Sequence, residues 1–349
     1  MFHTALPIEA ILDSDRPAGP GLDLGRSREG HVIEGFAFGS GTIHLSLIGG
    51  CHADEPVGPA TLSKLAGFLQ SLPDNDPLVT RISWRIVPHV NPDGRLRNAP
   101  WIRSTQQVED HRGLVDSGYQ LDDYLQHVVR ELPGDDIEFG FPRDPDDLEA
   151  RPENRAVADF LAVDAPYHLH GSFHGMGFAP GPWFLIEESW IDRTPALRDN
   201  LRQSVQNMGY GLFDPDRKGE KGFNRIDHGF CTRPDSIAMR AFFEACQDAE
   251  TAAKFRPSSM EYARSLGGDP LTFVSEMPLF ITPAGLSERA TEIADIQLIR
   301  SRLDEQLAAT GSAEQTAQEI GVRAMAIRDQ QRLQLRFLDE ALREVAHRL

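Results

Sequence analysis

The sequence predicts an α/β fold, in which a mixed and largely parallel sheet is covered by helices on both faces and is followed by a C-terminal helical extension. Between residues 41 and 283, short apolar segments typical of strands alternate with longer segments of helical periodicity. From Ala284 onward the composition turns to Glu, Gln, Arg, Ala and Leu, which favours helices. The chain has 349 residues, 40% of them hydrophobic, which is enough for one large core.

The predicted strands and helices follow one another in the order that a parallel sheet requires. Strands joined by helices run in the same direction, so their carboxyl ends meet at one edge of the sheet, where ligands bind in α/β proteins. The predicted strands are residues 42–50, 81–90, 166–172, 181–187 and 271–276, and the predicted helices are residues 56–72, 153–161, about 195–208 and about 235–249.

Three regions lie outside this alternation. Residues 1–40 are rich in Gly, Pro and Asp and are expected to form an irregular or short-stranded lead-in. The connection between Gly94 and Gly134 is long and polar, which favours a rim or lid that shapes specificity. Residues 284–349 are predicted to form two long helices separated at Gly311. The second helix has an apolar stripe that consists of Leu338, Leu342, Val345 and Leu349. This stripe either packs on the parent domain or joins two copies of the chain.

The turn after the first predicted strand of the domain carries residues that bind metals. The strand ends in Gly49 and Gly50, and His52 and Glu55 follow three positions apart, so one turn can aim both side chains at a single cation. A catalytic zinc ion takes three protein ligands and leaves its fourth position for water or substrate. His170 is the candidate third ligand, because it lies where another predicted strand meets a turn. His168 and His174, on either side of it, are not expected to be ligands: they are interpreted as hydrogen-bonded structural residues, with support of a ligand from behind as the alternative for one of them.

Four short motifs in order resemble the zinc carboxypeptidase (carboxypeptidase A-like) family. They are His52-x-x-Glu55, Asn91-Pro92-Asp93-Gly94, His170-Gly171 and Glu276 at the end of an apolar strand. The resemblance implies a zinc carboxypeptidase-like domain at residues 41–283, one Zn²⁺ ion held by His52, Glu55 and His170, and Glu276 as the catalytic carboxylate. A carboxylate in that role takes a proton from the attacking water and returns it to the departing amine.

The segment from Gly134 to Pro142 resembles the family's Gly-Val-Asp-Leu-Asn-Arg-Asn-Phe-Pro. Asp136 takes the place of the family's Asp and is expected to support a ligand imidazole. The family's Asn-Arg pair, which clamps the C-terminal carboxylate of a peptide, falls on Glu138-Phe139. An arginine grips a carboxylate with two parallel hydrogen bonds, whereas a phenyl ring cannot and a glutamate repels it. The change predicts that the chain is not a standard exopeptidase and that Glu138 contacts a cationic substrate group, unless Arg143 or Arg155 forms the clamp.

The family also places an arginine after its Asn-Pro-Asp-Gly turn, where it stabilises the oxyanion. Arg95, Arg97 and Arg103 follow that turn in this chain. Arg103 is the predicted oxyanion residue, because the segment Trp101-Ile102-Arg103 is most similar to the family's Trp-Arg-Lys. Arg97 is a further predicted substrate contact.

The composition excludes several classes of partner. A formal net charge of −18 disfavours nucleic acid, because neutralising phosphates requires clustered Lys and Arg. Three cysteines, Cys51, Cys231 and Cys246, form no paired framework and fit a reducing compartment. The N-terminal residues lack the basic start and apolar core of an export signal, and no stretch reaches the roughly 18 apolar residues of a membrane span. We therefore expect a cytoplasmic protein without membrane or nucleic-acid partners.

These observations together predict a zinc-dependent hydrolase of an amide bond in a small peptide or peptide-like substrate. The lost Asn-Arg clamp leaves an N-acyl amino acid deacylase, similar to the related aspartoacylase and desuccinylase branch, as an alternative, although that branch generally keeps its own Asn-Arg. A non-catalytic metal-binding module on the same fold is the alternative outside the enzymes. Such a module would be expected to lack a ligand or the general base, and this sequence has candidates for all four.

Overall fold

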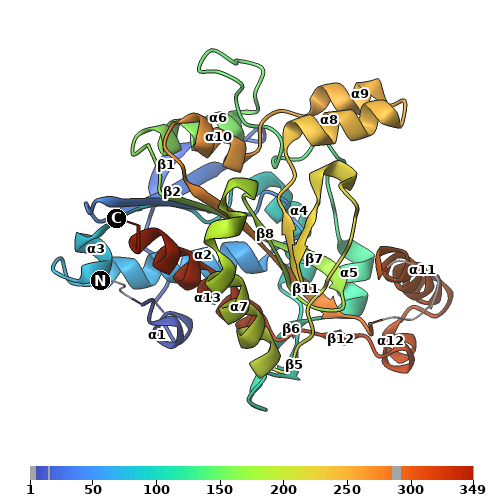
Figure 1. Cartoon of the computed structure of the whole chain (residues 1–349). Coiled ribbons are helices and arrows are strands. Elements are labelled where there is room, and N and C mark those ends of the chain that lie inside the picture. The colour runs from blue at the N-terminus through green and yellow to red at the C-terminus, as the bar shows by residue number, and fades with distance from the viewer. Residues whose placement is uncertain (1–4, 15, 285–291, 349) are drawn as a thin grey trace.

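The computed structural model describes residues 5–14, 16–284 and 292–348. Its main sheet has the strand order β1-β2-β4-β3-β7-β11-β8-β10-β9, with β12 paired to β11 (Figure 1). The central strands β4, β3, β7 and β11 are parallel to one another, and β8 is antiparallel to β11. The strands are β1 Leu22–Arg26, β2 Val32–Phe38, β3 Ile43–Gly49, β4 Ile82–Val87, β7 Leu169–Ala179, β8 Trp183–Ile186, β9 Arg225–Asp227, β10 Phe230–Thr232, β11 Leu271–Ile281 and β12 Arg323–Ala324.

Helices cover both faces of this sheet, which confirms the predicted fold class. The helices α2 and α13 pack on one face, with α7 against α13, and α6 and α10 pack on the other (Figure 1). A separate hairpin is formed by β5 Thr105–Glu109 and β6 Val115–Tyr119. The helices are α1 Ile8–Leu12, α2 Val57–Gln70, α3 Pro77–Thr80, α4 Pro92–Ile102, α5 Leu121–His127, α6 Pro152–Ala162, α7 Pro195–Asn207, α8 Ser236–Ala245, α9 Ala249–Lys254, α10 Ser259–Ser265, α11 Glu292–Thr310, α12 Glu314–Ile320 and α13 Ile327–Ala346, with short 3-10 helices at Glu188–Arg193 and Glu220–Gly222.

The strands β7 and β11 are longer than the sequence predicted. They pair in parallel from Leu169 opposite Leu271 to Ala179 opposite Ile281, whereas the predicted strands ended at residues 172 and 276. The glycines in β7 are required by packing rather than by a turn. A Cβ atom added to Gly171 would lie 2.5 Å from the Phe273 ring. The longer strands decide which side chains meet, because both candidate catalytic segments lie inside them.

The Asn-Pro-Asp-Gly motif begins helix α4. The Asn91 side chain accepts a hydrogen bond from the Gly94 backbone N–H at 2.9 Å, and Pro92 occupies the first helical position, where its missing N–H costs nothing. Asp93 is buried and accepts from the backbone N–H of Glu29 at 3.1 Å. The motif therefore fixes the loop after β4 against the β1–β2 turn.

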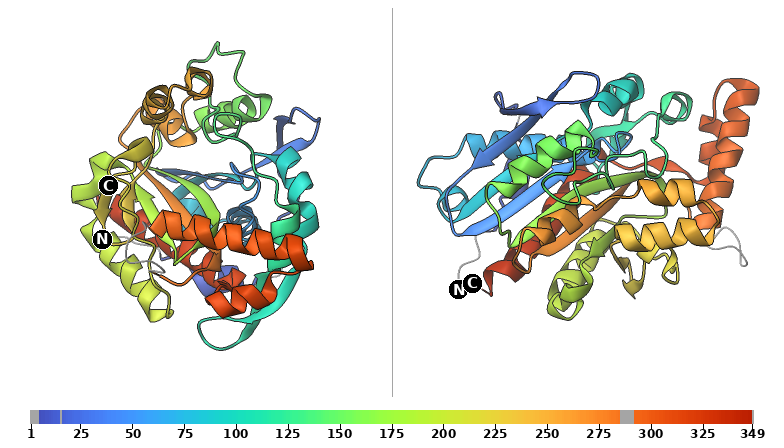
Figure 2. Two further views of the ribbon diagram at one scale, coloured as in Figure 1. Left: turned by 90° about the vertical axis from the view of Figure 1, so that its right-hand side faces the viewer. Right: turned by 90° about the horizontal axis from the view of Figure 1, so that it is seen from above.

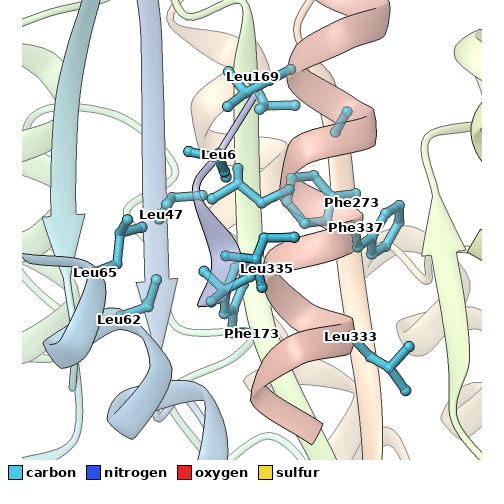
Figure 3. Close-up of a cluster of buried hydrophobic side chains, with 14 of the residues drawn as sticks. Leu6, Leu47, Leu62, Leu65, Leu169, Phe173, Phe273, Leu333, Leu335 and Phe337 are labelled. Atoms are coloured by element: carbon cyan, nitrogen blue, oxygen red, sulfur yellow. The ribbon is translucent and has the colours of Figure 1, made fainter. Parts of the chain in front are cut away.

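The C-terminal helix α13 is part of the main core. Phe337 is fully buried and lies 4.5 Å from Phe273 and 5.1 Å from Phe184 between ring centroids (Figure 3). The stripe residues Leu338, Leu342 and Val345 are also buried on the chain's own sheet, and Leu349 lies outside the described residues. Of the helical extension, α11 stands at one end of the molecule (Figure 2).

The predicted lead-in contributes to the main sheet and core. β2 pairs antiparallel with β4 and β1 with β2, so these strands extend the sheet at one edge. Helix α1 packs on α13, and the Leu6 backbone N–H donates to Asp339 Oδ1 at 2.8 Å. Residues 1–4 and 15 of this region lie outside the described part of the chain. Within residues 5–14, 16–284 and 292–348, every helix is too short or too polar to cross a membrane.

The connection between Gly94 and Gly134 holds α4, the β5–β6 hairpin and α5. The hairpin turn is tied to α13, because the carboxylate of Asp329 accepts from the His111 backbone at 2.7 Å and contacts its Nδ1 at 2.7 Å. Tyr210 Oη donates to the same carboxylate at 2.8 Å. Asp329 is fully buried, so these bonds hold the hairpin in one place.

Candidate functional site

The turn after β3 holds two of the predicted ligands together. Gly50 has a φ of +71°, a left-handed conformation that glycine adopts without strain, and a Cβ there would lie 2.6 Å from the His89 ring. The Glu55 backbone N–H then donates to the His52 carbonyl at 3.2 Å. This turn brings Glu55 Oε1 within 3.0 Å of His52 Nδ1.

His174 completes a three-residue cluster with this pair. It lies inside β7, with its Nδ1 3.0 Å from Glu55 Oε2 and 3.3 Å from His52 Nδ1. Ligands at zinc distances of about 2.0–2.1 Å in a tetrahedron stand roughly 3.3 Å apart. The three donor atoms therefore fit one Zn²⁺ ion, and two imidazoles with one carboxylate are ligand types that zinc takes.

The predicted third ligand, His170, is not in this cluster. Its Nδ1 lies 2.7 Å from Ser46 Oγ and its Nε2 3.0 Å from Ser259 Oγ, so hydroxyl groups occupy both ring nitrogens. Complete burial lowers its pKa to about 3, and the ring is neutral. The prediction failed because residues 170 and 174 point to the same face of one strand, and the strand was expected to end before His174.

Two more carboxylates stand behind the ligand imidazoles. Asp136 Oδ2 lies 3.9 Å from His52 Nε2, so the expected residue faces a ligand ring, although beyond hydrogen-bond distance. Glu138 Oε2 lies 3.1 Å from His174 Nε2, which Ser172 Oγ also contacts at 2.7 Å. Of these contacts, the one with Ser172 is a hydrogen bond, and such a partner fixes the orientation of a ligand imidazole.

The positions of Glu138 and Phe139 correct the predicted substrate contact. Glu138 is only 6% exposed and lies against His174 rather than in open space for a substrate cation. The Phe139 ring packs on Phe255 at 5.3 Å, and Phe255 stacks on Phe243 at 5.3 Å. Glu138 and Phe139 thus contact other residues of the protein, and neither carries a positive charge that could bind a carboxylate.

Glu276 lies beside His174 on the neighbouring strand. The register of the parallel strands β11 and β7 places Glu276 directly opposite His174, so both side chains belong to one face of the sheet. Glu276 is inside β11 and not at its end as predicted. Burial and the negative charge of Glu55 raise its pKa to about 8.

Arg130 provides a cation at the cluster, and the sequence analysis missed it. Its guanidinium nitrogens lie 3.2 Å from Asp54 Oδ2 and 3.4 Å from Glu55 Oε1. Its side chain is 51% exposed, and partial burial disfavours the charge, but Glu55 and Asp54 outweigh this effect and raise the pKa of Arg130. Arg130 lies shortly before Asp136 in the sequence, and this proximity could have indicated a cation at the site. The predicted oxyanion residues all followed the Asn-Pro-Asp-Gly turn directly.

The four arginines chosen from the sequence lie elsewhere. Arg103 is the exposed C-terminal cap of α4, and within the described residues no hydrogen bond or ion pair joins its side chain to the cluster. Arg97 is paired with Glu29 at 2.7 Å. Arg143 is exposed, and Arg155 is a half-buried residue of α6. Arg97 and Arg130 both line a cavity of about 360 Å³, together with Arg28, Glu29, Asp93, Glu131, Leu132, Asp135 and Arg151.

Opposite charges hold the cluster together. Burial disfavours an imidazolium ion, yet the Glu55 carboxylate raises the pKa of His52 to about 9, and Glu138 raises that of His174 well above its usual range. Burial opposes ionisation of Glu55, but His52 and His174 outweigh it and lower its pKa. Because zinc binds neutral imidazole, metal binding here is expected to release protons.

Comparison with known proteins identifies a family match over part of the chain. Residues 21–179 match the family described as zinc carboxypeptidase, and this stretch includes His52, Glu55 and His174. The chain is 33% identical over 101 residues to zinc carboxypeptidase A 1 of Anopheles gambiae, which covers 27% of this chain and 23% of that protein. It is 30% identical over 101 residues to carboxypeptidase B of Astacus astacus, with 27% and 33% covered. The chain thus spans about a third or less of the curated relatives that it matches.

Two solved structures are similar to this chain at low TM-scores. A metallo-carboxypeptidase from Burkholderia cenocepacia has a TM-score of 0.47 at 14% identity, covering 98% of this chain and 68% of that one. Bovine thrombin-activatable fibrinolysis inhibitor, in complex with tick carboxypeptidase inhibitor, has a TM-score of 0.49 at 13% identity, covering 98% and 95%. Both scores are below 0.5, so the assignment rests on the sequence match and on the residues of the site. The resemblance to zinc carboxypeptidases is confirmed over residues 21–179, which match that family of zinc-dependent hydrolases.

Proposed function

We propose that the chain hydrolyses an amide bond in small peptide or peptide-like substrates. The observation that supports this most directly is the convergence of His52, Glu55 and His174, with Glu276 opposite His174 in the sheet. A zinc ligand set beside a carboxylate is an arrangement that metal-assisted hydrolysis uses.

Each of these residues has a chemical role in the proposal. Zinc, when bound by His52, Glu55 and His174, supplies a Lewis acid that polarises a carbonyl group and makes water nucleophilic near neutral pH. Glu276 accepts the proton of the attacking water and then gives it to the departing nitrogen. Arg130, held in place by Asp54 and Glu55, donates to the carbonyl oxygen as that oxygen becomes negative.

The substrate class follows from the clamp position. An exopeptidase of this family needs a cation for the terminal carboxylate, and Phe139 is packed against Phe255 instead. Glu138 would repel such a carboxylate if it approached. We therefore propose that hydrolysis does not depend on a free C-terminal carboxylate held at residues 138–139.

An N-acyl amino acid deacylase is the second candidate. The cavity of about 360 Å³ that Arg130 lines also contains Arg28, Arg97 and Arg151, so an amino acid carboxylate could bind there. Four acidic residues line the same cavity, which weakens its attraction for anions. Because the charges nearly balance, we propose hydrolysis of a peptide-like substrate ahead of deacylation of an N-acyl amino acid.

The experiment combines a catalytic variant with paired substrates. Glu276→Gln is expected to abolish turnover while zinc content stays at one ion per chain, and Glu188→Gln, at an exposed position, is the matched control. Turnover by Glu276→Gln would overturn the assigned proton transfer. Peptides that end in a free acid or in an amide are then compared, and kcat/KM is expected to differ by less than about tenfold. A strict requirement for the free acid would contradict the proposed substrate class, and a preference for acylated free amino acids would favour the deacylase.

A further inference from the structure

A second cavity lies away from the metal cluster. It has a volume of about 660 Å³ and is enclosed by the loop after α1, strand β2, helix α2 and the start of α4. His52, Glu55, His174 and Glu276 are not among the residues that line it. This volume is in the range of sites that hold small molecules, which is roughly 300–1,000 Å³.

Positive charge predominates around this cavity, although the whole chain carries a net charge of −18. Arg16, Lys64 and Arg95 line it, and Glu34 is the one carboxylate among its lining residues. Within the described residues, Arg16 and Arg95 form no ion pair. The Lys64 ammonium donates to the backbone carbonyls of Leu12 and Ser14, both at 3.2 Å, and these bonds place it without neutralising it.

His89 adds a neutral hydrogen-bond donor. Its Nδ1 accepts from the Asn91 backbone N–H at 3.2 Å, so the ring proton is on Nε2. Burial and the charge of Arg95 lower the pKa of His89 to about 3, which keeps the ring neutral. No described residue forms a hydrogen bond with Nε2, and His89 lines the cavity.

The remaining wall is apolar and rigid. Val32 and Phe36 alternate along β2 on the cavity side, and Ala60 lies on α2. Prolines form much of the rest, and a proline ring fixes φ and removes a backbone donor. Polar recognition then comes from the side chains already named and from Ser14 and Ser63, which also line the cavity. The prolines are Pro17, Pro56, Pro59, Pro88 and Pro92.

We propose that this cavity binds a small organic anion with an apolar body, such as an aryl or alkyl carboxylate. Arg16, Lys64 and Arg95 neutralise the acid group, and Val32, Phe36 and the prolines cover the apolar body. The site is separate from the proposed hydrolase chemistry, so the two proposals can fail independently.

Calorimetric titration of the zinc-loaded protein tests the site with three probes of one shape. 4-Phenylbutyrate is expected to bind with one molecule per chain, and 4-phenyl-1-butanol at least tenfold more weakly. 4-Phenylbutylamine is expected to show no binding, because its ammonium group meets three cations. A double variant, Arg16→Gln with Arg95→Gln, is expected to weaken phenylbutyrate binding at least tenfold. Arg302→Gln, an exposed arginine of α11, is the control and should leave binding unchanged.

Two results would overturn the proposal. Equal binding of the acid, the alcohol and the amine would show that the positive charges do not select the ligand. Phenylbutyrate binding that survives the double substitution unchanged would place the anion elsewhere, for example on the zinc ion. Both altered arginines are exposed, so the double variant is expected to fold, and its thermal unfolding checks this.

Discussion

The identity of the third zinc ligand is the prediction on which the site depends. Structural zinc sites with four ligands bind with about 10–16 kcal/mol, so one ligand contributes about 3–4 kcal/mol. At about 1.4 kcal/mol for each factor of ten, His174→Gln is expected to weaken zinc binding by roughly 10²–10³-fold. His170→Gln leaves the cluster of His52, Glu55 and His174 intact, and its zinc affinity should stay within about threefold of the parent protein.

The assay is competition for zinc against a chromophoric chelator, with metal content measured in parallel. Glutamine at position 170 can still bond to Ser46 and Ser259, which makes His170→Gln a fair test of folding as well as of binding. Circular dichroism of both variants excludes global unfolding as the cause of a lost metal. Strong zinc binding by His174→Gln together with its loss in His170→Gln would refute the cluster described above.

Three further predictions concern catalysis and stability. Arg130→Gln is expected to lower kcat by about 10²–10³-fold in steady-state kinetics while zinc stays bound, and an unchanged kcat would remove Arg130 from the mechanism. His170 has a folded pKa of about 3 against 6.5 for an unperturbed ring, so below pH 6.5 the unfolded chain binds a proton that the folded chain does not. Stability is therefore expected to fall by about 2 kcal/mol between pH 6.5 and pH 5 from this residue, and urea unfolding of His170→Gln should show a correspondingly flatter pH dependence. Phe337→Ala is expected to lower the free energy of unfolding by about 3–5 kcal/mol, because its ring is fully buried between Phe184 and Phe273. Leu298→Ala, at a side chain that is 55% exposed, should change it by less than about 0.5 kcal/mol.

Local patterns were sufficient to predict the centre of the fold. The apolar run before Gly49 and the helical periodicity after Pro56 predicted β3 and α2 to within a few residues. The same reading placed His52 and Glu55 in one turn, because the turn is local in sequence. Features set by neighbouring residues are therefore recoverable from the sequence alone.

Features set by distant contacts were not recoverable in this way. The stripe that includes Leu338 and Leu342 favours a helix on its own domain but also fits a helix between two copies, and the packed core shows that α13 covers the chain's own sheet. Arg130 has no local motif, and its role depends on Asp54 and Glu55, which come from a different part of the chain. The choice between His170 and His174 depended on where β7 ends, which pairing with β11 decides.

Glu138 and Phe139, which stand where the family has Asn-Arg, can be explained together. In the family's arrangement an arginine follows the asparagine, and a glutamate in place of that asparagine would pair with the arginine and cancel its charge. With Phe139 directed into the cluster of Phe255 and Phe243, no such competitor is adjacent to Glu138. A buried carboxylate needs a polar partner, and the imidazole of His174, at 3.1 Å, is a partner that Glu138 faces. Phenylalanine at position 139 therefore leaves no neighbouring cation to compete for Glu138, and Glu138 faces the zinc-ligand candidate His174 instead.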